Sequence, residues 1–539
     1  MADTRTNLLW PEGEAKQIPK PARAIFTDLH IQEIIDAVCA AVTDYALADW
    51  YQAFPGNAAV IRHRHAVLRD LLDPMQHEAW SSFAQDMRGL RRQVDLARQL
   101  YHQRQRQRVF LGIICTYHQA LCSLTNSFAL SSPQSPALRA VCEAVRSEWK
   151  APQRQELHAT AATLRDELDT LGYDLQISGS HLSLWRQRQE RNVDAEIANC
   201  FSRFLAAEPS AEQARDEEVS GQMDLDPVEA RVLDAVAELY PETFARLASF
   251  TERWVQPGEK TAQATVPALD IGRYPFVFAP LLHWEREIHF YLAYLDYLAP
   301  LQANGLPNCI PELCDAEKRT LAADAYDLAL AQSLRQEQGQ ALVLNDIELR
   351  GNERILLVSG PNQGGKTTYA RCFGQLHYLA GIGLPVPARH AEIFVCDAIY
   401  TQFERHEDAN TGRSKLEADL RRLHKNLQHA TPRSIFILNE LFHSTTLADA
   451  RFLSQELLER LRHLDVLVLW VSFLEELSRA GADIISILST VAKEDQERRS
   501  FRLLREPADG LAHALSLAKK YGLDYQKLVE RIRHASPSS

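Results

Sequence analysis

The feature that most constrains this chain is the stretch RILLVSGPNQGGKTT at 354–368, where a short apolar run gives way to glycines and a lysine. Gly360, Gly365, Lys366 and Thr367 satisfy the pattern G-x-x-x-x-G-K-[ST] of a phosphate-binding loop. Glycines admit positive φ and carry no Cβ, so such a loop can approach phosphate oxygens closely. Its N–H groups and the positive end of the following helix then point at the anion. The stretch therefore predicts a nucleotide phosphate site.

The sequence on either side of this loop supports that prediction. Ile355 to Val358 has the pattern of a buried parallel strand, and apolar residues then recur at helical spacing as far as Gly381. Lys366 is expected to reach the β- and γ-phosphates, and the Thr367 hydroxyl is expected to ligate Mg²⁺. The predicted nucleotide-binding residues are Gly360, Pro361, Asn362, Gln363, Gly364, Gly365, Lys366, Thr367 and Thr368.

Composition narrows the class of protein. The 539 residues are 46% hydrophobic, enough for a large core and about three domains. A net charge of −12 excludes a protein that holds nucleic acid by its overall charge, although a local basic face stays compatible with it. None of the nine cysteines forms a C-x-x-C pair or has zinc-finger spacing, which favours reduced thiols in a cytoplasmic protein. We expect no signal peptide, because the start of the sequence has no basic region followed by an apolar one. We expect no membrane span, because the longest apolar stretch, 466–471, is too short.

The half of the chain before the loop is predicted to be mostly helical. Residues 1–21 have the composition of a flexible arm. Beyond them, Ile31, Ile34, Ile35, Val38 and Val42 form one apolar helical stripe, and similar stripes continue to about residue 170. A change to alternating apolar residues at 175–184 predicts a β-hairpin turning at 179–180. The acidic segment 206–226 is predicted to be an exposed loop.

Arginines crowd one long helical stretch in this half. Seven of them face a single aspartate, Asp95, between residues 88 and 108: Arg88, Arg91, Arg92, Arg98, Arg104, Arg106 and Arg108. Two interpretations stay open. The stretch is either a solvated helix face, which the composition favours, or a face that contacts phosphates.

A second motif downstream completes the expected chemistry of the loop. Four apolar residues in SIFILNE (434–440) predict a core strand, and Asn439 and Glu440 follow at its carboxyl end, where ligands bind in open α/β sheets. Glu440 is the candidate general base or water-orienting group. Asn439 stands where a carboxylate would hold Mg²⁺, and its neutral amide predicts weaker metal binding. The alternative is that the two residues only cap the next helix, but a cap does not require the apolar strand before it.

These motifs resemble the MutS family of DNA mismatch-repair ATPases. The opening Gly360-Pro361-Asn362 makes the match more specific than a general phosphate loop. The resemblance is strong over 340–530 and looser from about residue 22, as at 28–38 and 61–64. Its segments in the strong part are 360–368, 384–389, 391–394, 407–414, 445–446 and 512–529.

The resemblance implies a fold, cofactors and partners. It implies an α + α/β protein, with a long helical core and lever at 22–335, a hairpin and acidic loop near 175–226, and an ABC-type P-loop ATPase domain with a mainly parallel sheet at 336–539. It further implies ATP and Mg²⁺ as cofactors, DNA contacted mainly through its backbone, and a homodimer. Ser414 inherits the role of a serine that reaches the γ-phosphate bound by the partner subunit. Glu440, Lys366 and Ser414 are then the catalytic candidates, with Thr367 and Asn439 at the metal.

Departures from the family pattern shape the functional hypotheses. The core begins almost at once, which predicts a short MutS-like protein without the mismatch-recognition domain, and Phe250-Thr-Glu252 matches that domain's Phe-x-Glu wedge only by chance. Ser472 stands where family members usually have a histidine, which together with Asn439 predicts slow hydrolysis.

The first hypothesis is an ATP-dependent DNA-binding protein, a DNA damage sensor in mismatch repair or related repair and recombination, that works by nucleotide-driven dimer clamping. The alternative is a nucleotide-gated clamp or scaffold with negligible hydrolysis. A small-molecule kinase is disfavoured by the long helical half. The sequence leaves open the preferred DNA structure, mismatch recognition, the repair pathway, downstream proteins and the adenine contact.

Overall fold

The computed structural model places the chain in two compact units. It describes residues 6–11, 21, 23–178, 181–187, 225–255, 271–336, 342–361, 363–404, 415–491 and 499–507. Unit 1 comprises residues 1–6 and 72–286, and unit 2 comprises residues 7–71 and 287–539. Unit 2 is therefore assembled from two separate stretches of chain. The division at 21 and 335 that the sequence suggested stays a prediction.

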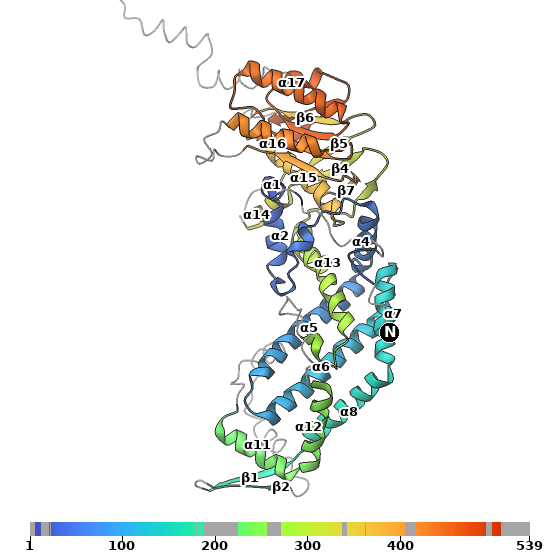
Figure 1. The fold of residues 1–539 in the computed structure, drawn as a ribbon, viewed down its shortest axis with the longest axis vertical. Coiled ribbons are helices and arrows are strands. Elements are labelled where there is room, and N and C mark those ends of the chain that lie inside the picture. The colour runs from blue at the N-terminus through green and yellow to red at the C-terminus, as the bar shows by residue number, and fades with distance from the viewer. Residues whose placement is uncertain are drawn as a thin grey trace, which may run out of the picture. The chain divides into compact units, whose positions relative to one another are not determined.

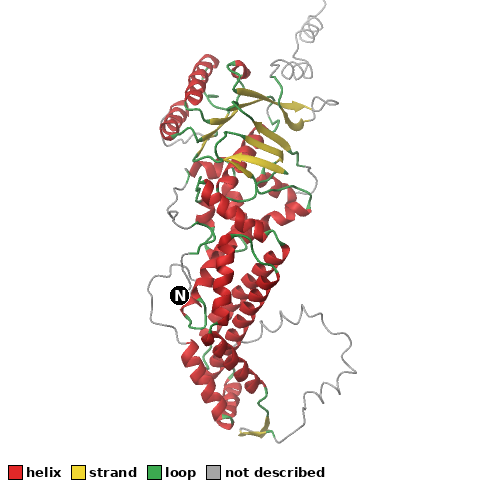
Figure 2. Cartoon of the chain, turned by 90° about the vertical axis from the view of Figure 1, so that its right-hand side faces the viewer, coloured by secondary structure: helices red, strands yellow, loops and turns green. Residues whose placement is uncertain are grey.

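The described residues of unit 1 are helical apart from one hairpin (Figures 1 and 2). Its elements are α5 (Pro74–Gln99), α6 (Gln103–Leu130), α7 (Pro136–Lys150), α8 (Pro152–Asp169), β1 (Tyr173–Ser178), β2 (His181–Arg186), α11 (Pro227–Leu239) and α12 (Pro241–Val255). The strands β1 and β2 pair in antiparallel register, with Leu175 opposite Leu184, as the alternating pattern predicts. The turn at 179–180 and almost all of the acidic segment 206–226 lie outside the described residues.

Capping residues followed by proline mark the starts of three helices in unit 1. Asp73, Ser135 and Asp226 each precede a proline and accept a hydrogen bond from a backbone N–H of the first turn. Proline suits the first helical position because its missing N–H would have no partner there, while the cap satisfies one of the free donors. Glu229 returns the bond at α11 and completes a capping box.

The arginine-rich stretch is tied into unit 1. Arg91 is buried and forms a two-pronged ion pair with Glu285, and Arg98 donates to the Tyr274 hydroxyl at 3.0 Å. Arg104 pairs with Asp234, and Arg108 lies 2.6 Å from Asp169. These four side chains hold helices together. Buried Arg91 therefore belongs to neither a solvated nor a phosphate-contacting face, whereas the partly exposed pairs of Arg104 and Arg108 are compatible with the solvated face.

Unit 2 contains two sheets and the helices that cover them. Its elements are α1 (Arg23–Asp28), α2 (Ile31–Cys39), η1 (Thr43–Tyr45), α3 (Ala48–Gln52), α4 (Ala58–Leu71), the larger part of α13 (Ala279–Ala303), β3 (Glu312–Cys314), β4 (Thr320–Ala325), α14 (Leu328–Gln336), β5 (Asn345–Leu349), β6 (Ile355–Ser359), α15 (Lys366–Gly381), β7 (His390–Phe394), β8 (Ile399–Gln402), α16 (Lys415–His429), β9 (Ile435–Asn439), α17 (Leu447–His463), β10 (Leu467–Val471), η3 (Glu475–Arg479), β11 (Ile484–Val491) and β12 (Arg499–Leu504).

The larger sheet has the order β12-β11-β6-β10-β9-β8. All of its neighbours are parallel except β11 and β12, which form an antiparallel pair. The smaller sheet has the order β3-β7-β4-β5 and is mostly antiparallel. A helical part with a small β insertion, followed by a mainly parallel sheet, confirms the predicted fold class.

Helices cover both faces of the larger sheet (Figure 1). Phe436 and Trp470 belong to the buried cluster that includes Leu457 and Leu461 of α17. Ile437 points to the opposite face, where it packs close to Gly374 of α15. Alternate residues of each strand thus bury themselves on opposite sides, which explains why β6, β9 and β10 consist of continuous apolar runs.

The first helices of the chain pack against α15, the helix that follows the phosphate loop. Gln375 donates to the Leu29 carbonyl at 3.0 Å, and the Tyr378 hydroxyl donates to the Tyr51 carbonyl at 2.8 Å. At the end of α15, the fully buried Arg64 donates to the Ile382 carbonyl at 2.6 Å. Residues 23–71 therefore support the nucleotide-binding part from the side away from the loop.

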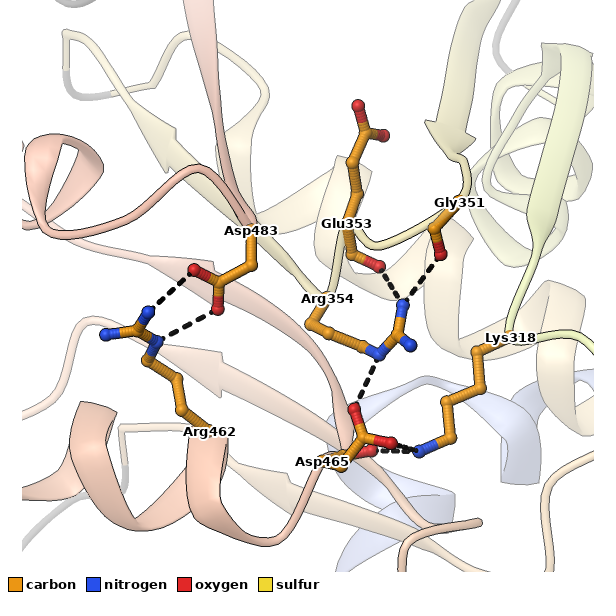
Figure 3. A network of polar contacts seen from close by, with 7 residues as sticks. All are labelled: Lys318, Gly351, Glu353, Arg354, Arg462, Asp465 and Asp483. Atoms are coloured by element: carbon orange, nitrogen blue, oxygen red, sulfur yellow. Dashed lines mark hydrogen bonds and ion pairs between the residues drawn. The ribbon is translucent and has the colours of Figure 1, made fainter.

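Charged residues pair at the amino ends of the central strands (Figure 3). Arg354, just before β6, lies 2.7 Å from a carboxylate oxygen of Asp465, which precedes β10 and also pairs with Lys318. Arg462 of α17 makes two 3.0 Å hydrogen bonds to Asp483, which precedes β11. These pairs join the starts of β6, β10 and β11 at the edge of the sheet opposite the phosphate loop.

Within the described ranges, no helix is both long enough and apolar enough to cross a membrane.

Candidate nucleotide-binding site

The phosphate loop leaves β6 at Ser359 and enters α15 at Lys366. Gly360 has a φ of 121°, and a Cβ there would lie 2.9 Å from the Ser489 carbonyl oxygen. At Gly364 a Cβ would lie 2.3 Å from the Ser489 hydroxyl oxygen. Only glycine fits both positions, because β11 packs directly behind the loop. Asn362 lies outside the described residues.

Ser489 is a site residue that the sequence did not reveal. Its hydroxyl donates to the Gly364 carbonyl at 2.6 Å, and the side chain is buried. This bond holds the loop against β11, the neighbour of β6 in the sheet. The sequence carries only a weak signal for it, a serine within the apolar run of β11, because the partner lies far away along the chain.

Lys366 lies inside the curve of the loop. Its Nζ donates to the carbonyls of Gly360 and Pro361, at 2.9 Å each, and lies 3.9 Å from Oε1 of Glu440. The side chain is only 7% exposed, so its charge acts in a partly desolvated space where electrostatic interactions are strengthened. The loop therefore concentrates a positive charge and several N–H dipoles at one point, which suits a phosphate group.

The side chains of Thr367 and Asn439 bring together two oxygen atoms that could ligate a metal ion. The Thr367 hydroxyl donates to the Asn439 side-chain oxygen at 3.3 Å, across the strand β10 that separates β6 from β9. Among the described residues, no group of three His, Cys, Asp or Glu side chains could hold a metal ion. A hydroxyl and an amide oxygen beside phosphates nevertheless suit Mg²⁺, which prefers oxygen ligands and retains several waters. The residues present therefore fit the metal.

Glu440 extends from a strained turn at the tip of β9. Its φ is 53°, an uncommon conformation for a residue with a Cβ, and Phe442 follows with a φ of 63°. The Glu440 N–H donates to the Val471 carbonyl at 2.9 Å, which fixes the turn to β10. Strain of this kind persists where surrounding structure imposes it, often at functional sites. From this turn the carboxylate lies 3.9 Å from Nζ of Lys366, with 28% of the side chain exposed.

Ser472 follows β10 and serves a local structural purpose. Its hydroxyl accepts a 3.0 Å hydrogen bond from the Leu474 N–H, and its side chain is buried. The hydroxyl therefore stabilises the turn after the strand.

A cavity of about 350 Å³ adjoins the loop and explains where a base could lie. It extends from Lys366 and Glu440 to an apolar compartment formed by Leu330, Leu334, Leu342, Val343 and Phe501. Asn345 donates to the Phe501 carbonyl at 3.1 Å and accepts from the Leu503 N–H at 2.8 Å, so it ties β5 to β12 at the rim. The sequence left the base contacts unassigned because these residues come from separate elements.

The structure brings together most of the predicted site residues. Lys366, Thr367, Asn439 and Glu440 meet at the carboxyl ends of β6 and β9, and Gln363, Gly365 and Thr368 line the same cavity. Ser414, the segment 407–414 and the predicted closing helices at 512–529 lie outside the described residues.

Comparison with known families agrees with this geometry. A family model described as MutS domain V matches residues 356–532, which include the phosphate loop, Asn439, Glu440 and Ser489. This region of the chain belongs to the MutS family. Domain V is the ATPase domain of MutS proteins, so the chain carries an ATPase, as the loop and the strand tip predict.

Curated MutS relatives also match part of the chain. An endonuclease MutS2 of Gemmatimonas aurantiaca is 29% identical over 203 residues, 37% of this chain and 24% of the relative. A DNA mismatch repair protein MSH3 of Phaeosphaeria nodorum is 31% identical over 35% of this chain and 17% of its own length. A DNA mismatch repair protein MutS of Granulibacter bethesdensis is 27% identical over 44% and 25%. The chain thus matches a quarter or less of each of these relatives.

Proposed function

We propose that this MutS-family ATPase binds DNA and grips or releases it through nucleotide-driven closure of a homodimer, in mismatch repair or related repair and recombination. The observation that carries the proposal is the meeting of Lys366, the Thr367–Asn439 pair and Glu440 at one sheet edge. DNA binding and dimerisation rest on the family and on the similarity to the DNA mismatch repair proteins MutS and MSH3. A cytoplasmic location remains part of the proposal.

In this proposal each side chain at the sheet edge has a distinct role. Lys366 binds the β- and γ-phosphates, and Thr367 and Asn439 would hold Mg²⁺, which when bound neutralises phosphate charge. Glu440 accepts a proton from the attacking water or orients it, from 3.9 Å beyond the lysine. The apolar compartment beside Phe501 and Leu342 takes the adenine base.

The decisive experiment is the substitution Glu440→Gln in the full chain. The amide keeps the size of the side chain and cannot accept a proton, so turnover should fall by roughly 10²- to 10⁴-fold while ATP binding is retained. Turnover is measured for parent and variant, with and without duplex and branched DNA. Stimulation of the parent by DNA supports the proposed DNA-linked function, and unchanged turnover in Glu440→Gln removes this carboxylate from the mechanism.

The second candidate function is a nucleotide-gated clamp or scaffold with negligible hydrolysis. Two observations favour it: the neutral Asn439 at the metal position, and the Ser472 hydroxyl engaged with Leu474. Under this alternative the parent would hydrolyse ATP no faster than Glu440→Gln, while ATP would still change its oligomeric state or its affinity for DNA.

The proposed homodimer shares each ATP site between subunits through Ser414. Ser414→Ala should bind ATP and turn it over slowly, whereas Lys366→Ala should not bind it. In a mixture of the two variants, mixed dimers confine both lesions to one site and leave the other complete. Activity above the sum of the separate variants supports the shared site, and activity equal to that sum argues against it.

A further inference from the structure

His443 lies beside the candidate catalytic carboxylate. The Nε2 atom of its ring is 3.7 Å from Oε2 of Glu440, while Oε1 of the same carboxylate is 3.9 Å from Nζ of Lys366. Glu440 therefore stands between a lysine from α15 and a histidine from its own turn. The 3.7 Å separation falls within ion-pair range and is longer than a hydrogen bond, as often found before substrate tightens a catalytic site.

The position of the imidazole is fixed from two sides. Phe442, next to it in the chain, is buried in the core cluster that includes Leu457 of α17, and its backbone is in the left-handed region. On the other side the His443 ring packs against the ring of Phe473, with 4.9 Å between centroids and an interplanar angle of 49°. The tilted contact is a favourable aromatic geometry. It orients the ring on its route to Glu440 while 37% of the side chain stays exposed.

Among the residues that the structure describes, no second histidine pairs with this carboxylate, and the end of the neighbouring strand β10 holds no histidine. Position 472, at the end of β10, holds the serine whose hydroxyl is used by Leu474 N–H. The groups recorded around Glu440 are therefore Lys366 on one oxygen and His443 on the other. A carboxylate with a nitrogen group in ion-pair range of each oxygen has fewer favourable orientations than one with a single such neighbour.

We propose that His443 is a positioning residue for ATP hydrolysis, acting through Glu440. An N–H at Nε2 donates to Oε2 and turns the other oxygen towards the space beside Lys366, where the attacking water is expected. The ring of Phe473 in turn orients the ring of His443 by packing against it. The inference rests on the proposed function of Glu440. It adds that the histidine acting on this carboxylate comes from the turn after β9.

The test compares steady-state ATP turnover of four full-length variants. His443→Ala should lower kcat about tenfold, corresponding to the loss of one charge-assisted contact of about 1.4 kcal/mol, with KM and equilibrium ATP affinity unchanged. His443→Gln should recover part of that loss because its amide N–H can still donate to Glu440. Phe473→Leu should give an intermediate kcat, because it removes the ring contact that orients His443 and keeps the histidine itself.

His390→Ala is the matched control. His390 also lies 3.7 Å from a glutamate, Glu392, but on β7 in the smaller sheet, and its loss should leave kcat unchanged. A parental kcat in His443→Ala would overturn the inference. So would equal losses in His443→Ala and His443→Gln, or a rise in KM without a fall in kcat.

Glu440→Gln separates this failure from failure of the proposed function. If Glu440→Gln stops turnover and His443→Ala does not lower it, the inference fails and the function of Glu440 stands. If Glu440→Gln turns over like the parent, the function of Glu440 fails, and the inference fails with it. Where both hold, adding His443→Ala to Glu440→Gln should lower turnover no further, because the histidine acts through the carboxylate.

Discussion

The two ends of the larger sheet differ although the same strands make both. At the amino ends of β6, β10 and β11, Arg354 pairs with Asp465 and Arg462 with Asp483 (Figure 3). At the carboxyl ends, Glu440 is held in a strained turn and Lys366 is held mainly by loop carbonyls. One end is closed by pairs of opposite charge. At the other end, the charges of Lys366 and Glu440 are placed to bind a ligand. Substitutions at the two ends should therefore affect different properties, ATP binding at the carboxyl ends and stability at the amino ends.

The largest expected effect is at the carboxyl end. Lys366→Ala should abolish ATP binding, at least a hundredfold in affinity, because the loop alone offers dipoles and no charge to the phosphates. Equilibrium binding of ATP measures it. The thermal unfolding midpoint without nucleotide should stay near that of the parent. An unchanged ATP affinity would mean that the carboxyl ends of the strands do not bind the phosphates through Lys366.

The next effect tests the packing behind the loop. Gly364→Ala would place a Cβ 2.3 Å from the Ser489 hydroxyl, so the loop must shift and ATP affinity should fall about tenfold. Adding Ser489→Ala removes the clashing oxygen and should restore part of the affinity. Gly89→Ala, in α5 with open space around it, is the control and should leave affinity alone. A double variant no better than Gly364→Ala would place the cause outside this contact.

A smaller effect is expected at Asn439. An aspartate there would add a negative charge near Mg²⁺, worth roughly 4 kcal/mol at 4 Å and an effective dielectric of 20 before desolvation. After desolvation, one or two kcal/mol should remain, so Asn439→Asp should lower the Mg²⁺ needed for half-maximal turnover by about tenfold.

The same substitution has the opposite sign without metal. In the presence of a chelator, the new carboxylate repels the phosphates, and ATP should bind Asn439→Asp more weakly than the parent. If Asn439→Asp needs more Mg²⁺ than the parent, residue 439 does not face the metal.

The smallest effect is at the amino end. Burial raises the pKa of Asp465, but hydrogen bonds from Lys318 and Arg354 outweigh it and hold that pKa below its usual range. Asp465→Asn keeps the shape, and asparagine tolerates the left-handed backbone found there, so the change isolates charge. Because the carboxylate is half exposed, we expect a loss below about 1 kcal/mol in the free energy of unfolding, with ATP affinity unchanged.

The pH dependence of that loss follows from the lowered pKa. A carboxyl with a lower pKa in the folded state stabilises the fold above its unfolded pKa of about 3.9, and loses this contribution as pH falls through the folded value. Denaturant unfolding of parent and Asp465→Asn should therefore differ at neutral pH and converge in acid. Asp324→Asn, which breaks a more exposed pair with Arg389, is the comparison. A difference that grows in acid would contradict the assignment.

The sequence predicted the parts of the site that local chemistry encodes. The loop at 360–368 and the strand ending in Asn439 and Glu440 were found because each carries strand, turn and polar residue in one short run. Ser489 and His443 were missed because their contacts depend on sheet order, which places β11 behind the loop and Phe473 beside the turn. Arg91 was misjudged because its partner, Glu285, lies 194 residues away.

The membership of residues 7–71 in unit 2 has a consequence for synthesis of the chain. Arg64 is buried between the Leu9 and Ile382 carbonyls, 318 residues separating it from the latter. Unit 1 is complete once residue 286 has left the ribosome, and domains generally fold as units during synthesis. Helix α2 packs against α14, and Leu29 just before it packs against Gly374 of α15, so this part of the chain must wait until residues 328–381 have emerged. During that interval the apolar stripe of α2 is exposed to chaperones and to other nascent chains. We therefore expect aggregation of the first seventy residues to depend on how fast the rest of the chain is translated.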